Sequence, residues 1–145
     1  VKGRKYIGTG TKYYFEDIGI RNAVVDFRQV EYTHIMENVV YNELRKQGYG
    51  VDVGVVESFK RDENGKLQRR NLEIDFVVNR HDERLYIQSA YALPDKEKID
   101  QEQASLLNVK DGFRKVIIVG DRYYSNYNEE GIMMMSLFDF LLGTK

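Results

Sequence analysis

The chain of 145 residues has no cysteine, a single proline and no long apolar run. Without cysteine, neither a disulfide framework nor a thiolate zinc site can form. A membrane-spanning helix needs about 20 mostly apolar residues, which no segment offers, and no signal peptide is visible. We therefore expect one cytoplasmic domain with no membrane partner. A chain of this length buries enough surface to fold without a covalent staple.

An excess of charge of one sign is also lacking, because the formal net charge is −1. Such a chain has no overall basic field that would attract nucleic acid. Residues 1–12 are rich in glycine and lysine but lack the spacing of a phosphate-binding loop. We predict a flexible leader there and a single domain over residues 13–145. The first residue is Val1 rather than methionine, which suggests a missing N-terminal partner domain.

Runs typical of strands alternate with helical patterns along the chain. The Asn64-Gly65 pair is a strong hairpin signal, and Asp17-Ile18-Gly19 is typical of a turn. The patterns predict strands at 13–15, 49–60, from the hairpin turn to 79, at 84–93, 115–120 and 132–135, and helices at 33–46, from 95 to before 112, and at 137–142. This order predicts a mixed α/β, or α+β, domain around one sheet.

The helix at 33–46, with Thr33 as its predicted cap and Gly48 as its end, contains a carboxylate on its apolar face. Apolar residues follow Glu37 at i+3, i+4 and i+7, so they share one side of the helix with it. A buried carboxylate needs a partner, a metal or a water pocket. A partly exposed glutamate in the first turn is instead favoured by the helix dipole. Both interpretations of Glu37 remain open.

Two further residues complete a candidate site. Asp75 lies in a predicted strand, where alternation places Ile74 and Phe76 together on the opposite face. Gln88 lies in the next strand, and we expect Glu37, Asp75 and Gln88 to converge in one pocket. The two carboxylate carbons are then expected within about 8 Å of each other, close enough to share one metal ion.

Several stretches that together extend over most of the chain carry a resemblance to one protein family. They are Tyr14-Phe15-Glu16-Asp17-Ile18-Gly19-Ile20-Arg21-Asn22, Glu37-Asn38-Val39-Val40-Tyr41-Asn42-Glu43-Leu44, Glu73-Ile74-Asp75-Phe76-Val77, Tyr86-Ile87-Gln88, Lys110-Asp111 and Asp139-Phe140-Leu141-Leu142. In these stretches the chain resembles the family of uncharacterised C-terminal domains of bacterial and archaeal AAA-type ATPases known as DUF4143.

This resemblance implies a restriction-endonuclease-like fold of the PD-(D/E)XK type, a mixed central sheet flanked by helices. It implies that Glu37 is the helix acid, that Asp75 is the strand acid that holds the metal, and that Gln88 replaces the second acid. Ala90 stands where this class has its lysine; Lys96 or Lys98 is a candidate substitute. The resemblance also implies an N-terminal ATPase domain in the same polypeptide, in which any ATP would bind.

Magnesium prefers oxygen ligands, so Glu37, Asp75 and the Gln88 carbonyl form a candidate magnesium site. Without metal, two carboxylates repel, and the glutamine amide donates a hydrogen bond that an ionised glutamate cannot. The sequence thus favours a neutral relic, with no cofactor in this domain, over a working site.

The predicted hairpin tip is rich in basic residues. Either they contact phosphates, or they form an ordinary solvated tip with acids interspersed. The candidate nucleic-acid-binding residues are Lys60, Arg61, Lys66, Arg69 and Arg70.

Three functional hypotheses follow from these patterns. The leading one is a non-catalytic accessory domain of an ATPase that binds a partner, either nucleic acid or another copy of the chain. The second is a metal-dependent DNA endonuclease with a substituted third motif. The third is an oligomerisation module, with the Met133-Met134-Met135 strand as an interface edge.

Overall fold

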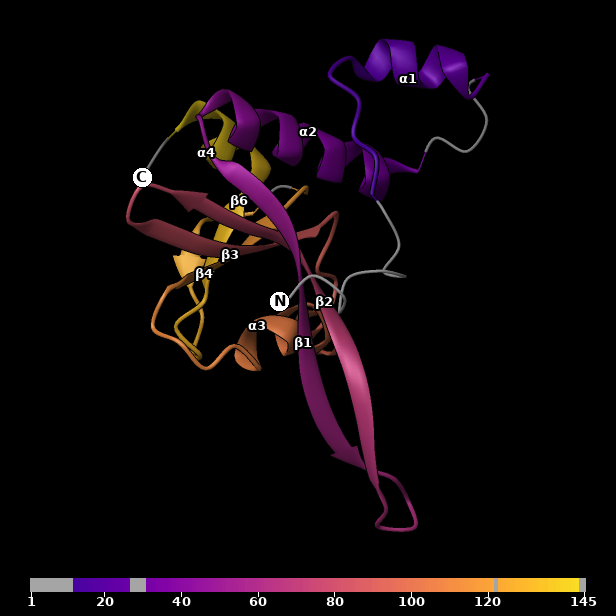
Figure 1. Ribbon diagram of the computed structural model, residues 1–145, viewed down its shortest axis with the longest axis vertical. Coiled ribbons are helices and arrows are strands. Elements are labelled where there is room, and N and C mark those ends of the chain that lie inside the picture. The colour runs from indigo at the N-terminus through magenta and orange to yellow at the C-terminus, as the bar shows by residue number, and fades with distance from the viewer. Residues whose placement is uncertain (1–11, 27–30, 122, 144–145) are drawn as a thin grey trace, which may run out of the picture.

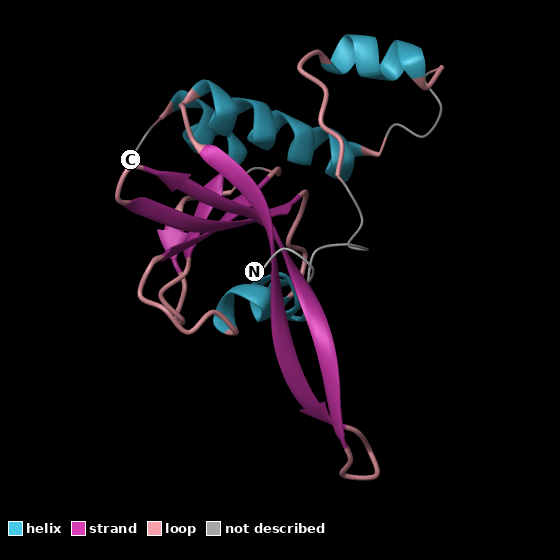
Figure 2. Cartoon of the chain, in the orientation of Figure 1, coloured by secondary structure: helices cyan, strands magenta, loops and turns pink. Residues whose placement is uncertain are grey.

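The computed structural model describes residues 12–26, 31–121 and 123–143, and it has the mixed α/β architecture that the sequence predicts. In this part of the chain one six-stranded sheet is flanked by helices (Figures 1 and 2). The elements are α1 (Ile18–Val24), α2 (Tyr32–Lys46), β1 (Gly50–Arg61), β2 (Leu67–Arg80), β3 (Glu83–Ala90), α3 (Lys96–Leu107), β4 (Arg114–Val119), β5 (Asn126–Tyr127), β6 (Met133–Ser136) and α4 (Leu137–Leu142). No helix in the described ranges is long and apolar enough to cross a membrane.

The strand order is β1-β2-β3-β4-β6-β5. Strands β3, β4 and β6 run parallel, whereas the other neighbours are antiparallel. The methionine-rich strand β6 is paired on both sides, by β4 and β5. The prediction that this strand forms an interface edge is therefore wrong.

Each face of the sheet carries its own apolar core. Helices α2 and α4 cover one face and α3 covers the other (Figure 1). The α2 core includes Val40, Phe76 and Ile87, and the α3 core includes Ile74, Leu106 and Ile117. The central strand β4 contributes to both cores, as its continuous apolar run predicts.

Two predictions for the N-terminal part are wrong. Residues 13–15 form no strand, because the Asn38 side chain on α2 binds both hydrogen-bonding groups of the Phe15 backbone, at 2.9 and 2.7 Å. Asp17 begins a helix rather than a turn, since its carboxylate accepts a hydrogen bond from the Ile20 amide at 3.0 Å and caps α1. The predicted leader lies outside the described residues except for its last one.

The prediction that Thr33 caps α2 is wrong, because Thr33 lies inside that helix. Helix α2 begins one residue before Thr33, after Glu31, and no side chain caps it. Asp95 and Ser136, residue types that favour helix N-caps, cap α3 and α4, each accepting a backbone amide hydrogen bond. Gly143 ends α4 in the left-handed conformation, with φ of 66°, which glycine adopts without strain.

A β-bulge interrupts β2 where it pairs with β1. The register pairs Asp52 with Val77 but Gly54 with Ile74, so β2 has one residue more than β1 between these pairs. Ile74 consequently belongs to the α3 core and Phe76 to the α2 core, although the sequence predicts both on one face. Gly54 lies against the bulge, where a Cβ atom would come within 2.7 Å of Val77.

Strands β1 and β2 form a long hairpin whose distal half projects away from the rest of the sheet (Figure 1). Strand β2 pairs with β3 only from Phe76 to Arg80, so its residues nearer the turn pair with β1 alone. The predicted turn is present: Gly65 has φ of 74° and its amide donates to the Asp62 carbonyl at 2.9 Å.

Candidate functional site

Glu37 on α2 and Asp75 on β2 meet at the ammonium group of Lys12. Lys12 Nζ lies 2.7 Å from Glu37 Oε1 and 3.3 Å from Asp75 Oδ1. A third carboxylate oxygen, Glu73 Oε1, lies 2.6 Å from the same nitrogen. These four residues form what we call the Lys12 pocket. The structure thus brings two of the three predicted site residues together, around a cation that belongs to the chain.

Tyr14 holds Glu37 from a second direction. Its hydroxyl donates to Glu37 Oε1 at 2.7 Å, and its ring stacks on Tyr41 of α2 with 4.2 Å between ring centroids. Burial raises the pKa of Tyr14 well above its usual value, and the Glu37 carboxylate raises it further. Tyr14 is therefore a neutral donor at any physiological pH.

Asp75 is buried, and its second oxygen is bound by β3. Asp75 Oδ2 accepts hydrogen bonds from the Ser89 amide at 2.9 Å and from Ser89 Oγ at 3.1 Å. The pairing of β2 with β3 stops at Phe76, so the Asp75 carboxylate takes the place of a backbone partner for the Ser89 amide. Burial raises the pKa of Asp75, although the Ser89 amide and Lys12 oppose the shift.

The charge of Lys12 is stabilised by the carboxylates around it. Burial by itself lowers the pKa of Lys12, but hydrogen bonds to Glu37 and Glu73 and the nearby charge of Asp75 reverse this effect. The net result is a pKa raised well above the usual lysine value. The Lys12 side chain consequently stays positively charged at physiological pH.

Gln88, the third predicted site residue, does not enter the Lys12 pocket. Its Oε1 accepts from the Asp75 backbone amide at 3.3 Å and from Ser105 Oγ at 3.4 Å. Its Nε2 lies 3.5 Å from Glu102 Oε2, and both Ser105 and Glu102 belong to α3. Because side chains alternate along β3, Ser89 rather than Gln88 reaches the Asp75 carboxylate. The expected convergence of all three residues is therefore wrong for Gln88.

The position where the nuclease class has its lysine, and the predicted substitute for that lysine on α3, lie outside the Lys12 pocket. Ala90 is 2% exposed and packs in the α3 core. Lys98 pairs with Glu102 at 2.5 Å along α3. The cation beside Asp75 is instead Lys12, the last residue of the predicted leader. No local pattern signals this role, since the contacts span 25 residues to Glu37 and 63 residues to Asp75.

Four carboxylate oxygens of the pocket are already bound by protein donors. Glu37 Oε1 accepts from Lys12 and Tyr14, and Asp75 Oδ2 accepts twice from Ser89. Magnesium needs oxygen ligands at about 2.1 Å, so it would have to displace the ammonium group. Within the described ranges, no group of three His, Cys, Asp or Glu residues is arranged to hold a metal ion. The present arrangement fits an ammonium group rather than magnesium.

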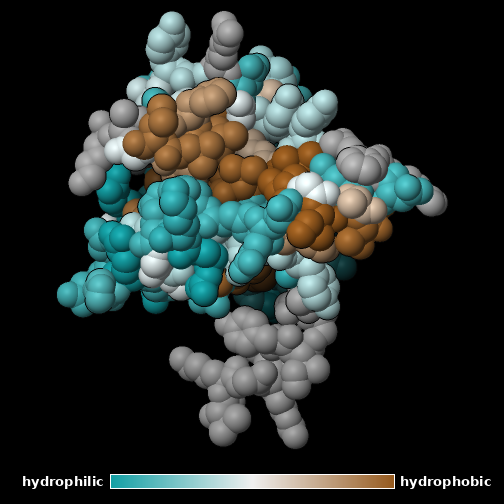
Figure 3. Space-filling model, turned by 90° about the horizontal axis from the view of Figure 1, so that it is seen from above, coloured by the Kyte–Doolittle hydropathy of each residue, from teal (hydrophilic) through white to brown (hydrophobic). Residues whose placement is uncertain are grey.

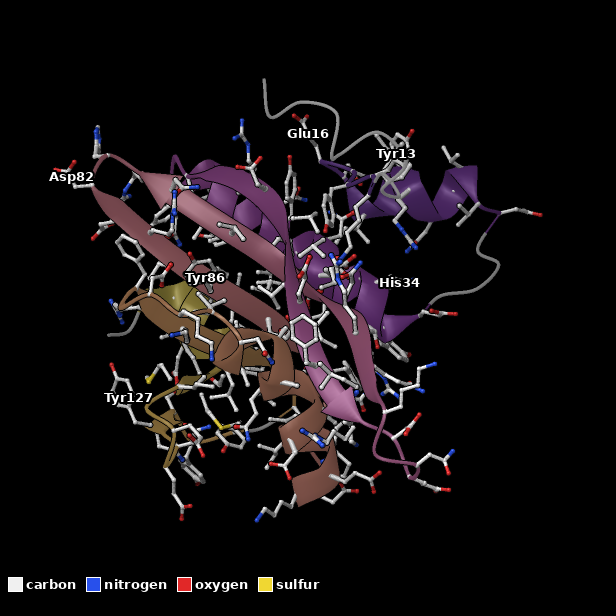
Figure 4. All side chains as sticks on the ribbon, turned by 60° about the horizontal axis from the view of Figure 1, so that its bottom comes forward. Tyr13, Glu16, His34, Asp82, Tyr86 and Tyr127 are labelled. Carbon is white, nitrogen blue, oxygen red and sulfur yellow. The ribbon has the colours of Figure 1, made fainter. Side chains whose placement is uncertain are left out.

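A shallow cavity opens beside Lys12, and the basic hairpin residues lie outside it. Tyr13 and His34 line this cavity. Both lie on the side of the molecule where α1 and α2 begin (Figure 4). Tyr127 marks the opposite end of the sheet in the same view. The candidate nucleic-acid-binding residues Lys60, Arg61, Lys66, Arg69 and Arg70 all lie on the projecting part of the β1–β2 hairpin. The structure therefore separates the two predicted sites.

Comparison with known proteins finds one curated relative. The chain is similar to an uncharacterised protein of Haemophilus influenzae, with 33% identity over 142 residues that cover 98% of this chain and 31% of the relative. The chain thus spans about a third of the length of the curated relative that it matches. No protein-family model matches the chain. No solved structure matches it either.

Proposed function

We propose that this chain is a non-catalytic accessory domain of a longer protein, with a nuclease-like fold in which Lys12 has replaced the metal ion. The contact of the Lys12 ammonium with Glu37, Glu73 and Asp75 carries the proposal. An ammonium group there occupies the space that a divalent cation would need. Its positive charge also reduces the negative charge that would attract such a cation.

The length of the relative and the exposure of α1 support an accessory role. The matched region is 31% of the Haemophilus influenzae protein, so most of that protein lies outside the match, and an ATPase part is what the DUF4143 resemblance implies for such a longer protein. Helix α1 has seven residues, none of them buried, and such a short helix is marginal on its own. Its Ile20 and Val24 are 60% and 68% exposed. Hydrophobic side chains gather on this side of the molecule, which is seen from above in Figure 3.

We infer that α1 packs against the ATPase part of the same cytoplasmic polypeptide, which would bind ATP. Coexpression of the two parts tests this inference. Ile20→Asp with Val24→Asp is expected to abolish their copurification while it leaves the melting temperature of the isolated domain unchanged. Copurification that survives the double change would contradict it.

Cleavage assays test the absence of catalysis. The protein is incubated with duplex, single-stranded and branched DNA in magnesium or manganese, and no cleavage is expected. Calorimetric titration is expected to detect no magnesium binding at millimolar concentrations. Metal-dependent cutting that Asp75→Ala abolishes would overturn the proposal.

The alternative is a metal-dependent endonuclease in which Lys12 supplies the positive charge that Ala90 lacks. The 3.3 Å contact between Lys12 and Asp75 favours this alternative over one that relies on Lys96 or Lys98. Lys12→Ala separates the two proposals. In an endonuclease it removes the cleavage that the parent chain shows, whereas in an accessory domain it lowers the melting temperature and neither protein cleaves DNA.

A further inference from the structure

The distal half of the β1–β2 hairpin has no partner within the described part of the domain. Strands β1 and β2 have 12 and 14 residues, about twice the usual strand length. The first five residues of β2 are all exposed. A two-stranded ribbon with no third strand and no helix beneath it is at best marginally stable in water. We therefore expect the ribbon to be stabilised by binding to another molecule.

Cross-strand pairs divide this ribbon into two chemically different faces. Ser58 pairs with Arg70 and Lys60 pairs with Gln68, so these four side chains share one face. All four are hydrogen-bonding side chains. The opposite face includes Phe59, which is 57% exposed, and Arg69, which forms an ion pair with Glu57. We call the face of Ser58, Lys60, Gln68 and Arg70 the polar ribbon face.

The ribbon tip is positively charged, although the whole chain is not. Residues 57–70 contain five basic and three acidic residues, while the formal charge of the chain is −1. The acids are partly neutralised locally: Glu57 pairs with Arg69, and Asp62 accepts hydrogen bonds from the amides of Asn64 and Lys66 within the turn. Among described residues, no acid forms a salt bridge with the basic residues Lys60, Arg61, Lys66 and Arg70.

Both the shape and the chemistry of the ribbon match double-stranded DNA. The major groove of B-form DNA admits a two-stranded β-ribbon, and its base edges are recognised by Arg, Lys, Gln and Ser side chains. These are the four residue types on the polar ribbon face. Unpaired cations at the tip supply phosphate contacts. Double-stranded RNA does not fit, because its major groove is too deep and narrow for side chains to read.

We propose that the β1–β2 hairpin is a DNA-binding arm that places its polar ribbon face in the major groove of duplex DNA. Lys60, Gln68 and Arg70 contact base edges, and Arg61 and Lys66 contact phosphates. The proposal deepens the proposed accessory role by naming a partner. It does not depend on the Lys12 pocket, because the arm binds without cleaving and without metal.

Fluorescence anisotropy in EDTA tests the arm separately from any metal chemistry. The full chain is titrated against a labelled 24-base-pair DNA duplex of mixed sequence at several salt concentrations. We expect micromolar affinity at low salt, as is usual for binding without an optimised sequence, and a logarithmic salt slope of about −2 for two phosphate contacts. Lys60→Gln with Arg70→Gln is expected to weaken binding at least tenfold.

Matched variants decide whether the arm is responsible. Lys46→Gln with Lys110→Gln removes the same charge from exposed positions outside the arm and is expected to change affinity less than twofold. Lys60→Arg with Arg70→Lys keeps both charges and is expected to retain binding within threefold. If Lys60→Gln with Arg70→Gln and Lys46→Gln with Lys110→Gln lower the affinity for DNA equally, the proposal is wrong. The absence of DNA binding at 0.1 mM protein would also overturn it.

Two further measurements address other partners. A 24-base-pair RNA duplex is expected to bind at least fivefold more weakly than the DNA duplex, and equal binding would refute placement in the major groove. Sedimentation velocity is expected to show the same oligomeric state for the parent chain and Phe59→Ser. Dissociation of an oligomer by Phe59→Ser would instead identify the opposite ribbon face as a contact between copies and overturn the DNA assignment.

Discussion

Replacement of Lys12 by methionine tests the central feature of the candidate site. The change keeps an unbranched side chain that is one heavy atom shorter, but it leaves Glu37, Glu73 and Asp75 without a shared counter-charge. Removal of one partner from a buried ion pair costs about 3–5 kcal/mol. The Lys12 side chain is 25% exposed, so water screens part of this effect and we expect about 2–3 kcal/mol. For a chain of this size the melting temperature should fall by roughly 8 °C.

The pH dependence of this destabilisation gives a sharper test than its size. The pKa of folded Lys12 is raised, so its stabilising contribution is complete below the unfolded value of 10.5 and is lost as the pH rises through the folded pKa. The difference in melting temperature between the parent chain and Lys12→Met should therefore persist from neutral pH to about pH 10. It should shrink in acid, where Asp75, whose pKa is raised by burial, takes up a proton and no longer needs the counter-charge.

Lys46→Met is the matched control. Lys46 pairs with Glu43 at 3.2 Å, but its side chain is 77% exposed. Exposed pairs contribute little, so the melting temperature should change by at most about 2 °C. Thermal unfolding followed by circular dichroism measures all three proteins. A loss for Lys12→Met that is no larger than that of the control, or equally large at pH 4 and pH 7, would refute the charge-balance argument.

Three other substitutions probe the surroundings of the pocket. Asp75→Asn should change the free energy of unfolding at neutral pH by less than about 1 kcal/mol, because burial already raises the pKa of this carboxyl. Since the raised pKa favours the protonated folded form, the parent chain should gain stability relative to the variant as the pH falls. Melting temperatures measured from pH 7 to pH 4 test this gain. Tyr14→Phe should cost about 1–2 kcal/mol in urea unfolding through the lost hydrogen bond to Glu37. Ala90→Lys should lower the melting temperature by more than 8 °C, because it buries an unpaired charge at a site that is 2% exposed.

The sequence predicts the elements whose signals are local. The apolar run of β4, the Asn64-Gly65 turn and the capping residues of α3 and α4 are each determined by a few neighbouring residues, and all of them are found. The start of α1 also has a local signal, since Asp17 is a good cap. Gly19 favours a turn in the sequence, but it lies inside this helix.

The sequence does not reveal what depends on contacts between distant residues. The bulge in β2 arises from pairing with β1 opposite Gly54, and strict alternation within β2 contains no sign of it. The Lys12 pocket joins α2, β2 and a segment that precedes both. Its cation lies in a glycine-rich segment that is typical of a flexible leader. Carboxylates are easier to locate from sequence than their counter-charge, because a strand or helix fixes their direction and a long lysine side chain can approach from anywhere.

Any divalent cation that enters the Lys12 pocket must therefore compete with a cation that the chain supplies. Lys12 makes contacts of 2.7, 2.6 and 3.3 Å that would all be lost, and Tyr14 would still occupy Glu37 Oε1. Metal binding would consequently be coupled to release of the segment that carries Lys12. Hydrogen exchange at residues 12–16 of the native chain should be the same with and without 10 mM magnesium. Faster exchange in magnesium would show that metal displaces Lys12 and would favour the endonuclease over the accessory domain.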